Sequence, residues 1–315
     1  MLILAPMYDV TDTTFRQVVA ACAPPDMFFT EFVNVEGLQS AGRPRLEHFL
    51  KLEDTGVPVV AQIWGKNPDN YYQTAKELAE LGFAGIDINT GCPDKTIVKN
   101  GCCSAFIKQE NRENFAQILA ATKHGVKDSG SNIPVSVKTR LGFNETDFGW
   151  HEFLLKLGVD MLTIHGRTRK EMSKVPVRWD EIEHIRKLRD AVAPQTKIIG
   201  NGDVSGRAEA LELQARYGLD GIMIGRGIFT NPYFFAENAE DIWASKTSAD
   251  KIALYIKHLE LYRSNYPNGE RKFDPVKKFM KVYLSGFDGA SELRAQIANI
   301  HSCEQAIEIL RNSLE

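Results

Sequence analysis

Three side chains that can do chemistry follow apolar runs in this 315-residue sequence. Cys92 lies in DINTGCPDK, Lys138 ends IPVSVK, and His165 lies in IHGRT. A thiol can act as a nucleophile or as a proton donor, and its pKa decides which. A lysine at the end of an apolar run either pairs with an anion, such as an electron-rich cofactor ring, or reaches water. A histidine there either contacts a polar ligand atom or makes a structural hydrogen bond.

Two glycine-containing turns predict a phosphate site. The segments IIGNGD and IMIGRG contain Asn201, Gly202, Asp203, Gly225 and Arg226. Glycine lets a backbone approach a ligand closely, and an arginine offers a planar fork of donors to a phosphate. Tight turns also need glycine, so turn geometry explains these glycines equally well when they are taken alone.

Eight short apolar runs, separated by amphipathic stretches, must position these residues. Strands that alternate with helices predict an α/β fold with a parallel sheet, and eight such units predict a (β/α)8 TIM barrel; an open doubly wound sheet is the second choice. Residues that follow the strands of such a barrel meet at one face. The predicted strands are 2–6, 27–30, 57–63, 85–89, 133–138, 159–165, 196–201 and 219–225.

The C-terminal part of the sequence carries only helical periodicity. After Phe235 the helical stretches are 249–265, 274–284, 290–297 and 302–314. We therefore predict a barrel over residues 1–240 and a helical domain over 241–315. Within the barrel, Asn67-Pro68 and Ser205 are expected to open helices, and Gly82, Gly158 and Gly218 to end them.

Composition predicts a globular enzyme of the cytoplasm. The sequence is 43% hydrophobic and 25% charged, which argues against disorder. No run approaches the roughly 18 apolar residues of a membrane span, and no export signal opens the chain. The five cysteines have no CxxC spacing, which favours reduced thiols and predicts no metal site. The net charge of −3 divides into +2 over residues 244–315 and −5 over the rest, so the tail is the more basic part.

An ordered set of motifs resembles the tRNA-dihydrouridine synthase family. They are LAPMYDVTD, the strand-end Gln62, DINTGCPDK, VSVKTRLG, IHGRT, GNGD and MIGRG, and in the tail KKFMKVYLSGF and SELRAQI. The resemblance implies that FMN and NADPH serve as cofactor and reductant and that uridines in tRNA are reduced to dihydrouridine. It does not fix the oligomeric state, for which we expect a monomer. It also implies that the helical domain binds tRNA.

Site residues follow from the resemblance. Cys92 would be the general acid that protonates uracil C5 after hydride reaches C6, a role that needs a neutral thiol, and burial is expected to keep its pKa up. The flavin would contact Pro6, Met7, Tyr8, Gln62, Lys138, His165, Asn201, Gly202, Asp203, Gly225 and Arg226. Uridine or RNA contacts would be Asn89, Lys95, Arg140 and Arg167. In the tail, a cluster of cations around Asp274 offers candidate phosphate contacts, with Tyr283 as a stacking candidate, and a solvated helix face is the alternative; these cations are Arg271, Lys272, Lys277, Lys278 and Lys281.

Some features leave alternatives open. Tyr8-Asp9 stands where relatives often have small or flexible residues, which puts the shape of the substrate pocket in question. Three rivals are an FMN barrel reductase for a free pyrimidine or small enone, a flavin-free lyase or isomerase that uses Lys138 as a Schiff-base amine, and a tRNA-binding protein without redox activity. The basic tail argues against the first, and Cys92 with Lys138 against the third.

Overall fold

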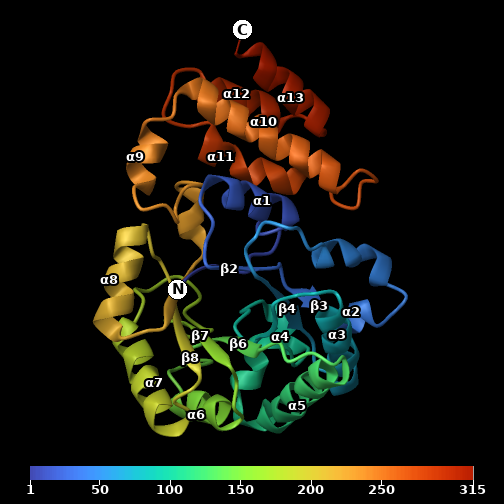
Figure 1. Cartoon of the computed structure of the whole chain (residues 1–315), viewed down its shortest axis with the longest axis vertical. Helices are drawn as coiled ribbons and strands as arrows, with labels where there is room; N and C mark the ends of the chain where they lie inside the picture. The colour runs from blue at the N-terminus through green and yellow to red at the C-terminus, as the bar shows by residue number, and fades with distance from the viewer. Residues whose placement is uncertain (315) are drawn as a thin grey trace.

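Eight parallel strands close into a barrel in the computed structural model, which describes residues 1–314 (Figure 1). The strands are β1 Leu2–Leu4, β2 Met27–Phe29, β4 Val59–Trp64, β5 Gly85–Asn89, β6 Val135–Arg140, β7 Met161–His165, β8 Lys197–Asn201 and β9 Gly221–Ile224. Pairing of β2 with β4 closes the ring, and the two-residue strand β3 (Val33–Asn34) adds to β4. The barrel is confirmed over the open sheet, and each of the eight predicted runs overlaps one strand, although β4 and β6 extend one and two residues beyond the predicted ends.

The strands are short apolar runs because both of their faces are covered. Inside the barrel, Ile3, Phe29, Val60, Ile199 and Met223 form a small core of their own. The outward-facing residues pack against the surrounding helices in a second, larger core. A parallel sheet that is buried on both sides needs this near-continuous apolar pattern, which is why the strands are clearly marked in the sequence.

Helices surround the barrel and begin at local capping signals. The longer ones are α1 Thr13–Cys22, α3 Pro68–Glu80, α5 Arg112–Asp128, α6 Phe148–Lys156, α7 Trp179–Val192 and α8 Arg207–Tyr217. Short α-helices are α2 Val35–Leu38 and α4 Lys95–Lys99, and 3-10 turns are Arg43–Arg45, Glu47–Leu50, Cys103–Ile107, Gln109–Asn111 and Arg226–Phe229. Asn67 caps α3 as predicted. The prediction that Ser205 opens α8 is wrong by one residue, since Gly206 is the N-cap and Ser205 bonds Glu209 instead.

The residues after β9 form helices only. They are α9 Ala239–Ala244, α10 Ser248–Asn265, α11 Met280–Tyr283, α12 Ala290–Ala298 and α13 Cys303–Asn312, with a 3-10 turn over Asp274–Phe279. The single helix predicted over 274–284 is therefore a 3-10 turn followed by a short α-helix. Helix α9 spans residue 240, where the two predicted parts were divided. No helix within residues 1–314 is both long and apolar enough to cross a membrane.

The C-terminal helices lie over α1, at the β1 side of the barrel (Figure 1). The ring of Phe15 on α1 is 4.5 Å from that of Phe279 and 5.9 Å from that of His258. Tyr283 is fully buried beside His258, 3.0 Å from its Nδ1, so the expectation that it stacks on a base is wrong.

Candidate active site

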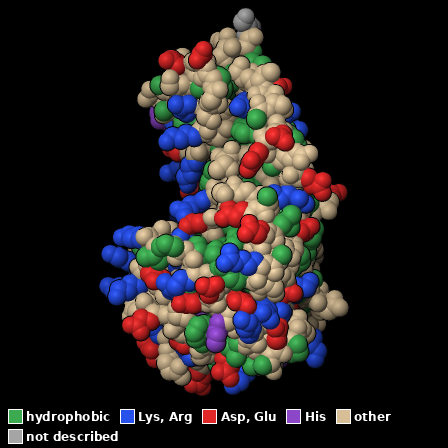
Figure 2. All heavy atoms as spheres, turned by 90° about the vertical axis from the view of Figure 1, so that its left-hand side faces the viewer, with side chains coloured by type: hydrophobic (Ala, Val, Ile, Leu, Met, Phe, Trp, Pro, Cys, Tyr) green, Lys and Arg blue, Asp and Glu red, His purple; other side chains and the backbone are tan. Residues whose placement is uncertain are grey.

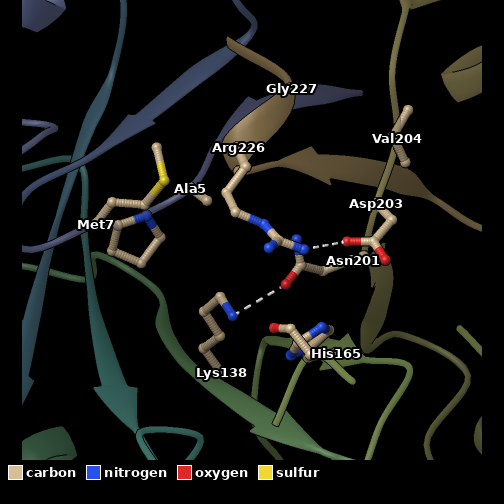
Figure 3. A pocket seen from close by; sticks show the side chains of 13 residues that line it. Ala5, Met7, Lys138, His165, Asn201, Asp203, Val204, Arg226 and Gly227 are labelled. Carbon is tan, nitrogen blue, oxygen red and sulfur yellow. Dashed lines mark hydrogen bonds and ion pairs between the residues drawn. The ribbon is translucent and has the colours of Figure 1, made fainter. Parts of the chain in front are cut away.

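A polar cavity of about 200 Å³ lies at the C-terminal ends of the strands (Figure 3). Strand ends from five parts of the sequence meet there, as a barrel requires. Of the eleven residues predicted to contact a flavin, nine line this cavity: Pro6, Met7, Lys138, His165, Asn201, Gly202, Asp203, Gly225 and Arg226. The geometry therefore brings the glycine turns together with the lysine and the histidine.

Lys138 and His165 lie on one side of this cavity. The Nζ of Lys138 donates to Oδ1 of Asn201 at 3.2 Å, and Nδ2 of Asn201 donates to the carbonyl of Met223 at 2.8 Å. Burial, with Arg140 nearby, lowers the pKa of Lys138 to about 8. The same two causes lower the pKa of His165 to about 2, so this imidazole is neutral at physiological pH. A neutral imidazole can donate to or accept from a polar ligand atom.

The opposite side carries an arginine whose side chain is largely exposed, although it is paired with an aspartate. Arg226 has two thirds of its side chain exposed and donates to Asp203 at 2.5 Å. Asp203 also accepts from Arg167, and this bond is the main cause of its lowered pKa. Gly202 has a φ of 142°, and a Cβ there would lie 2.7 Å from Val177. Glycine is required at this position, and its backbone stays open to a ligand.

Cys92 and Tyr8 line a neighbouring apolar cavity of about 360 Å³. The ring of Tyr8 is 5.6 Å from that of Phe32 and 5.7 Å from that of Phe49, and Trp64 completes the aromatic wall. The prediction that Tyr8 lines the flavin cavity is therefore wrong, because Tyr8 lines the apolar cavity instead. The loop after β1 joins the two cavities, because Pro6 and Met7 lie in one and Tyr8 in the other.

The Cys92 thiol is more acidic than expected from burial alone. A hydrogen bond with Cys103 lowers the pKa of Cys92 to about 7, which outweighs the opposing effect of burial. The expectation that burial keeps this pKa up is wrong, because it ignored a second buried thiol. A proton donor whose pKa lies near the working pH is nevertheless well matched to general acid catalysis.

Three predicted ligand contacts are occupied by protein partners. Gln62 is fully buried and bonds Asp87 and Asn89, so it lines neither cavity. Arg140 is 8% exposed and donates to the backbone carbonyls of residues 91, 168 and 172. Arg167 is 2% exposed and donates to Asp203 and to the carbonyl of Val175. The prediction that Arg140 and Arg167 contact RNA is therefore wrong, because both guanidinium groups are buried and hydrogen-bonded within the protein.

The basic residues predicted in the tail differ in exposure. Arg271 is 4% exposed and pairs with the buried Glu31, so it cannot meet a phosphate and that prediction is wrong. Lys277 is 13% exposed and bonds Asp274 at 2.9 Å. Lys272 and Lys278 are exposed, as is Lys95 at the start of α4.

Asp87 is the site residue that the motif reasoning missed. It is fully buried on β5, where it accepts from Gln62 at 2.7 Å and from Ser136 at 2.6 Å. An acid within the apolar run GIDIN is the signal that could have identified it, because a buried carboxylate needs partners. Among residues 1–314, no three His, Cys, Asp or Glu side chains are grouped so that they could hold a metal ion.

Comparison with known proteins gives the same family over the whole chain. The family model for dihydrouridine synthase matches residues 3–315. A probable tRNA-dihydrouridine synthase of Staphylococcus aureus is 42% identical over 311 residues, covering 98% of this chain and 91% of that protein. Probable tRNA-dihydrouridine synthase 2 of Bacillus subtilis is 43% identical over 312 residues, covering 98% and 92%.

Solved structures share the barrel at low sequence identity. The old yellow enzyme homologue of Zymomonas mobilis aligns with a TM-score of 0.51 and 14% identity, over 78% of this chain and 89% of that one. A 2-naphthoyl-CoA reductase aligns with a TM-score of 0.57 and 11% identity, over 79% and 50%. These likenesses concern the fold alone. The family match over residues 3–315 and the curated relatives above 40% identity show that the chain belongs to the dihydrouridine synthase family.

Proposed function

We propose that this protein is a tRNA-dihydrouridine synthase that uses FMN and NADPH to reduce the C5=C6 bond of uridines in tRNA. The observation that carries the proposal is the pair of neighbouring cavities joined by the loop after β1. One is polar and holds Lys138, His165 and Arg226, and the other is apolar and holds Cys92. A phosphorylated redox cofactor fits the first, and a nucleobase fits the second.

The residues of the polar cavity fit FMN. Arg226, two thirds exposed, and the open backbone of Gly202 suit its phosphate, and Lys138 suits the electron-rich end of its ring. FMN bound there would supply hydride to uracil C6. A pKa of about 8 still leaves the Lys138 amine mostly charged at neutral pH, and an anionic ring would favour the charged form further, while neutral His165 adds no second positive charge.

Cys92 would supply the proton. Hydride transfer to C6 leaves negative charge on C5 and the O4 carbonyl, and the Sγ–H of Cys92 would transfer its proton to C5. The aromatic walls of Tyr8, Phe49 and Trp64 would hold an extruded base by its faces. The adjacent backbone amides of Gly91 and Cys92 are already bonded to Asn89, so they do not compete for the base.

Affinity for tRNA would come from exposed cations of the helical part, residues 241–315. Lys272 and Lys278 are exposed there, and Lys95 lies exposed at the start of α4, just after the loop that carries Cys92. Figure 2 displays Lys and Arg side chains along the edge of one face, beside the hollow between the helices and the barrel. Cations contact phosphates without reading sequence, so this surface would bind tRNA by its backbone. We propose a monomer as the acting species.

Arg226→Ala is expected to weaken FMN binding about tenfold. An exposed charge-assisted contact contributes about 1–2 kcal/mol, and about 1.4 kcal/mol corresponds to tenfold. Quenching of FMN fluorescence on titration with flavin-free protein measures the dissociation constant. Lys187→Ala is the control, since Lys187 is an exposed lysine of α7 paired with Glu183. If the Arg226→Ala variant and the wild type bind FMN with equal affinity, Arg226 does not contact the phosphate.

The experiment that tests the function is dihydrouridine formation on tRNA that lacks this modification, with purified protein and NADPH. We expect bound FMN by absorbance, NADPH oxidation, and dihydrouridine detected by mass spectrometry of the digested tRNA. A flavoprotein that oxidises NADPH but leaves tRNA unchanged would favour the free-pyrimidine or enone reductase. A protein that binds no flavin would favour the lyase or isomerase.

A further inference from the structure

Two thiols meet at the edge of the apolar cavity. Cys92 lines this cavity, whereas Cys103 is fully buried. A hydrogen bond joins the two side chains, in which the S–H group of Cys103 donates to the sulfur of Cys92. Because a disulfide bond is about 2.05 Å long, two sulfurs that are already in contact need a short approach to form one.

The short helix α4 lies between these cysteines in the chain and brings them together. It spans Lys95–Lys99, and Gly101 follows it with a φ of 80°. The N–H of the next residue donates to the carbonyl of Ile97 at 3.2 Å, which closes the Schellman turn that commonly ends a helix. The chain leaves this turn in a new direction, which returns Cys103 to the side chain of Cys92.

The backbone at Cys103 is strained. Its φ is 52°, in the left-handed region, where a Cβ atom crowds the following carbonyl oxygen and where glycine is favoured. A glycine at this position would relieve the strain and would lose the thiol. Strain that persists in a folded protein points to a role for the residue that bears it, and this side chain bonds Cys92.

The two thiols differ in acidity in the way that stepwise oxidation requires. The hydrogen bond from Cys103 lowers the pKa of Cys92 to about 7, so about half of this thiol is ionised at neutral pH. Burial raises the pKa of Cys103 well above its usual range, so this group stays a thiol. Peroxides oxidise thiolates to sulfenic acids, which condense with a neighbouring thiol. The cavity exposes Cys92 to a small neutral oxidant, and the buried Cys103 reacts second.

We infer that Cys92 and Cys103 form a modification site at which hydrogen peroxide converts the two thiols to a disulfide. The Cys92 thiolate attacks one oxygen of the peroxide, so an S–O bond forms, the O–O bond breaks, and hydroxide leaves. The sulfur of Cys103 then attacks the sulfur of Cys92, so the S–S bond forms, the S–O bond breaks, and a second hydroxide leaves. The two hydroxides take the protons that the two thiols have lost. Two thiols and one peroxide thus yield one disulfide and two molecules of water, and two electrons pass from sulfur to oxygen.

The effect on catalysis rests on the proposed function, in which Cys92 is the proton donor. A disulfide sulfur carries no proton, so the oxidised protein would not reduce uridine until a thiol reductant reopens the bond. NADPH would still reduce flavin in the polar cavity, which Cys92 does not line. The disulfide is reversible, whereas Cys92 without a partner thiol would proceed to sulfinic acid, which thiol reductants do not restore.

Peptide mapping of the oxidised holoenzyme tests the modification without tRNA. The protein is treated with hydrogen peroxide, free thiols are blocked with N-ethylmaleimide in denaturant, and trypsin is added without reductant. Cleavage after lysines places Cys92 in the peptide 77–95 and Cys103 in the peptide 100–108. We expect mass spectrometry to find these two peptides joined, with the loss of two hydrogens, and dithiothreitol to separate them.

Cys103→Ser and Cys102→Ser distinguish the partner thiol from its neighbour. A serine hydroxyl at position 103 can still donate to Cys92 but cannot form a disulfide. Cys102 is the matched control, because it lies in the same tryptic peptide and its sulfur bonds the carbonyl of Asn100 instead. We expect joined peptides in Cys102→Ser but not in Cys103→Ser, where Cys92 should gain two oxygens as sulfinic acid.

Dihydrouridine formation should follow the same pattern. In fully oxidised wild type we expect a loss of about 10²–10⁴-fold, the range for removal of a general acid, and recovery after dithiothreitol. Cys102→Ser should behave like the wild type, whereas Cys103→Ser should lose activity that dithiothreitol does not restore.

The peptide map of the wild type decides the question even if Cys103→Ser does not fold. A wild-type Cys92 that stays reduced or becomes sulfinic acid, without joined peptides, would overturn the inference. Joined peptides that persist in Cys103→Ser, or recovery of that variant equal to wild type, would do the same. Joined peptides in a wild type that forms no dihydrouridine would support the modification and overturn the proposed function instead.

Discussion

Replacement of Cys92 by alanine is expected to lower dihydrouridine formation by about 10²–10⁴-fold while NADPH still reduces the bound flavin at the wild-type rate. This range is typical for loss of a general acid. The two half-reactions separate because Cys92 lines the apolar cavity and does not line the polar one. Stopped-flow absorbance measures flavin reduction by NADPH, and the same signal measures reoxidation after tRNA is added.

The pH dependence of the wild type should report the same thiol. A proton donor works in its neutral form, so reoxidation by tRNA should fall as the pH rises through about 7, the pKa of Cys92. Cys103→Ala removes the hydrogen bond that lowers this pKa and should move the fall to higher pH. Cys102→Ala is the control, because Cys102 is buried and bonds the carbonyl of Asn100. Reoxidation that proceeds normally in Cys92→Ala would assign the proton to another group.

The fold and the polar cavity could be predicted because both follow from local patterns. Each strand is an apolar run covered on both faces, and the residues after parallel strands must meet at one end of a barrel. Lys138, His165, Asn201 and Arg226 were therefore placed together correctly from the sequence alone. No long-range information was needed beyond the order of the strands.

The exposure of individual charged residues could not be predicted in this way. Arg271 looks like one more cation in the basic run RKFDPVKK, but its partner Glu31 lies 240 residues earlier. Gln62 lies near the end of β4 and Arg140 ends β6, as ligand contacts often do, yet their polar atoms are bonded within the protein. Strand-end position predicts where a side chain lies, whereas its partners depend on tertiary packing.

The unusual Tyr8-Asp9 pair has a structural explanation that the sequence did not offer. Asp9 has a φ of 57°, its N–H donates to Glu31 at 2.5 Å, and its carboxylate accepts from Arg271 and Lys278. The C-terminal helices thus hold the loop that joins the two cavities. Asp9 serves to fix this loop, and Tyr8 is turned to the aromatic wall as a result.

Arg271→Met is expected to destabilise the protein by about 3–5 kcal/mol at pH 8, because it leaves the buried Glu31 without its partner. Burial already raises the pKa of Glu31 to about 7 even with Arg271 present. Loss of the arginine raises it further, and the pKa of Asp12, a buried acid that also faces Arg271, rises too. Unfolding by guanidinium chloride, followed by tryptophan fluorescence, measures the difference in free energy.

The sign of the pH effect distinguishes this mechanism from lost packing. A folded-state pKa above the ordinary value of 4.5 means that the folded protein binds the proton more tightly, so stability falls as the pH rises from about 4.5 through the folded value. The deficit of Arg271→Met should therefore shrink toward pH 5, where Glu31 becomes neutral. Adding Glu31→Gln should restore most of the stability at pH 8, whereas Lys272→Met, a change in the exposed neighbour, should have little effect. A deficit that is equal at pH 5 and pH 8 would mean that Arg271 stabilises the protein through its contacts with the rings of Phe49 and Tyr266 and not through its charge.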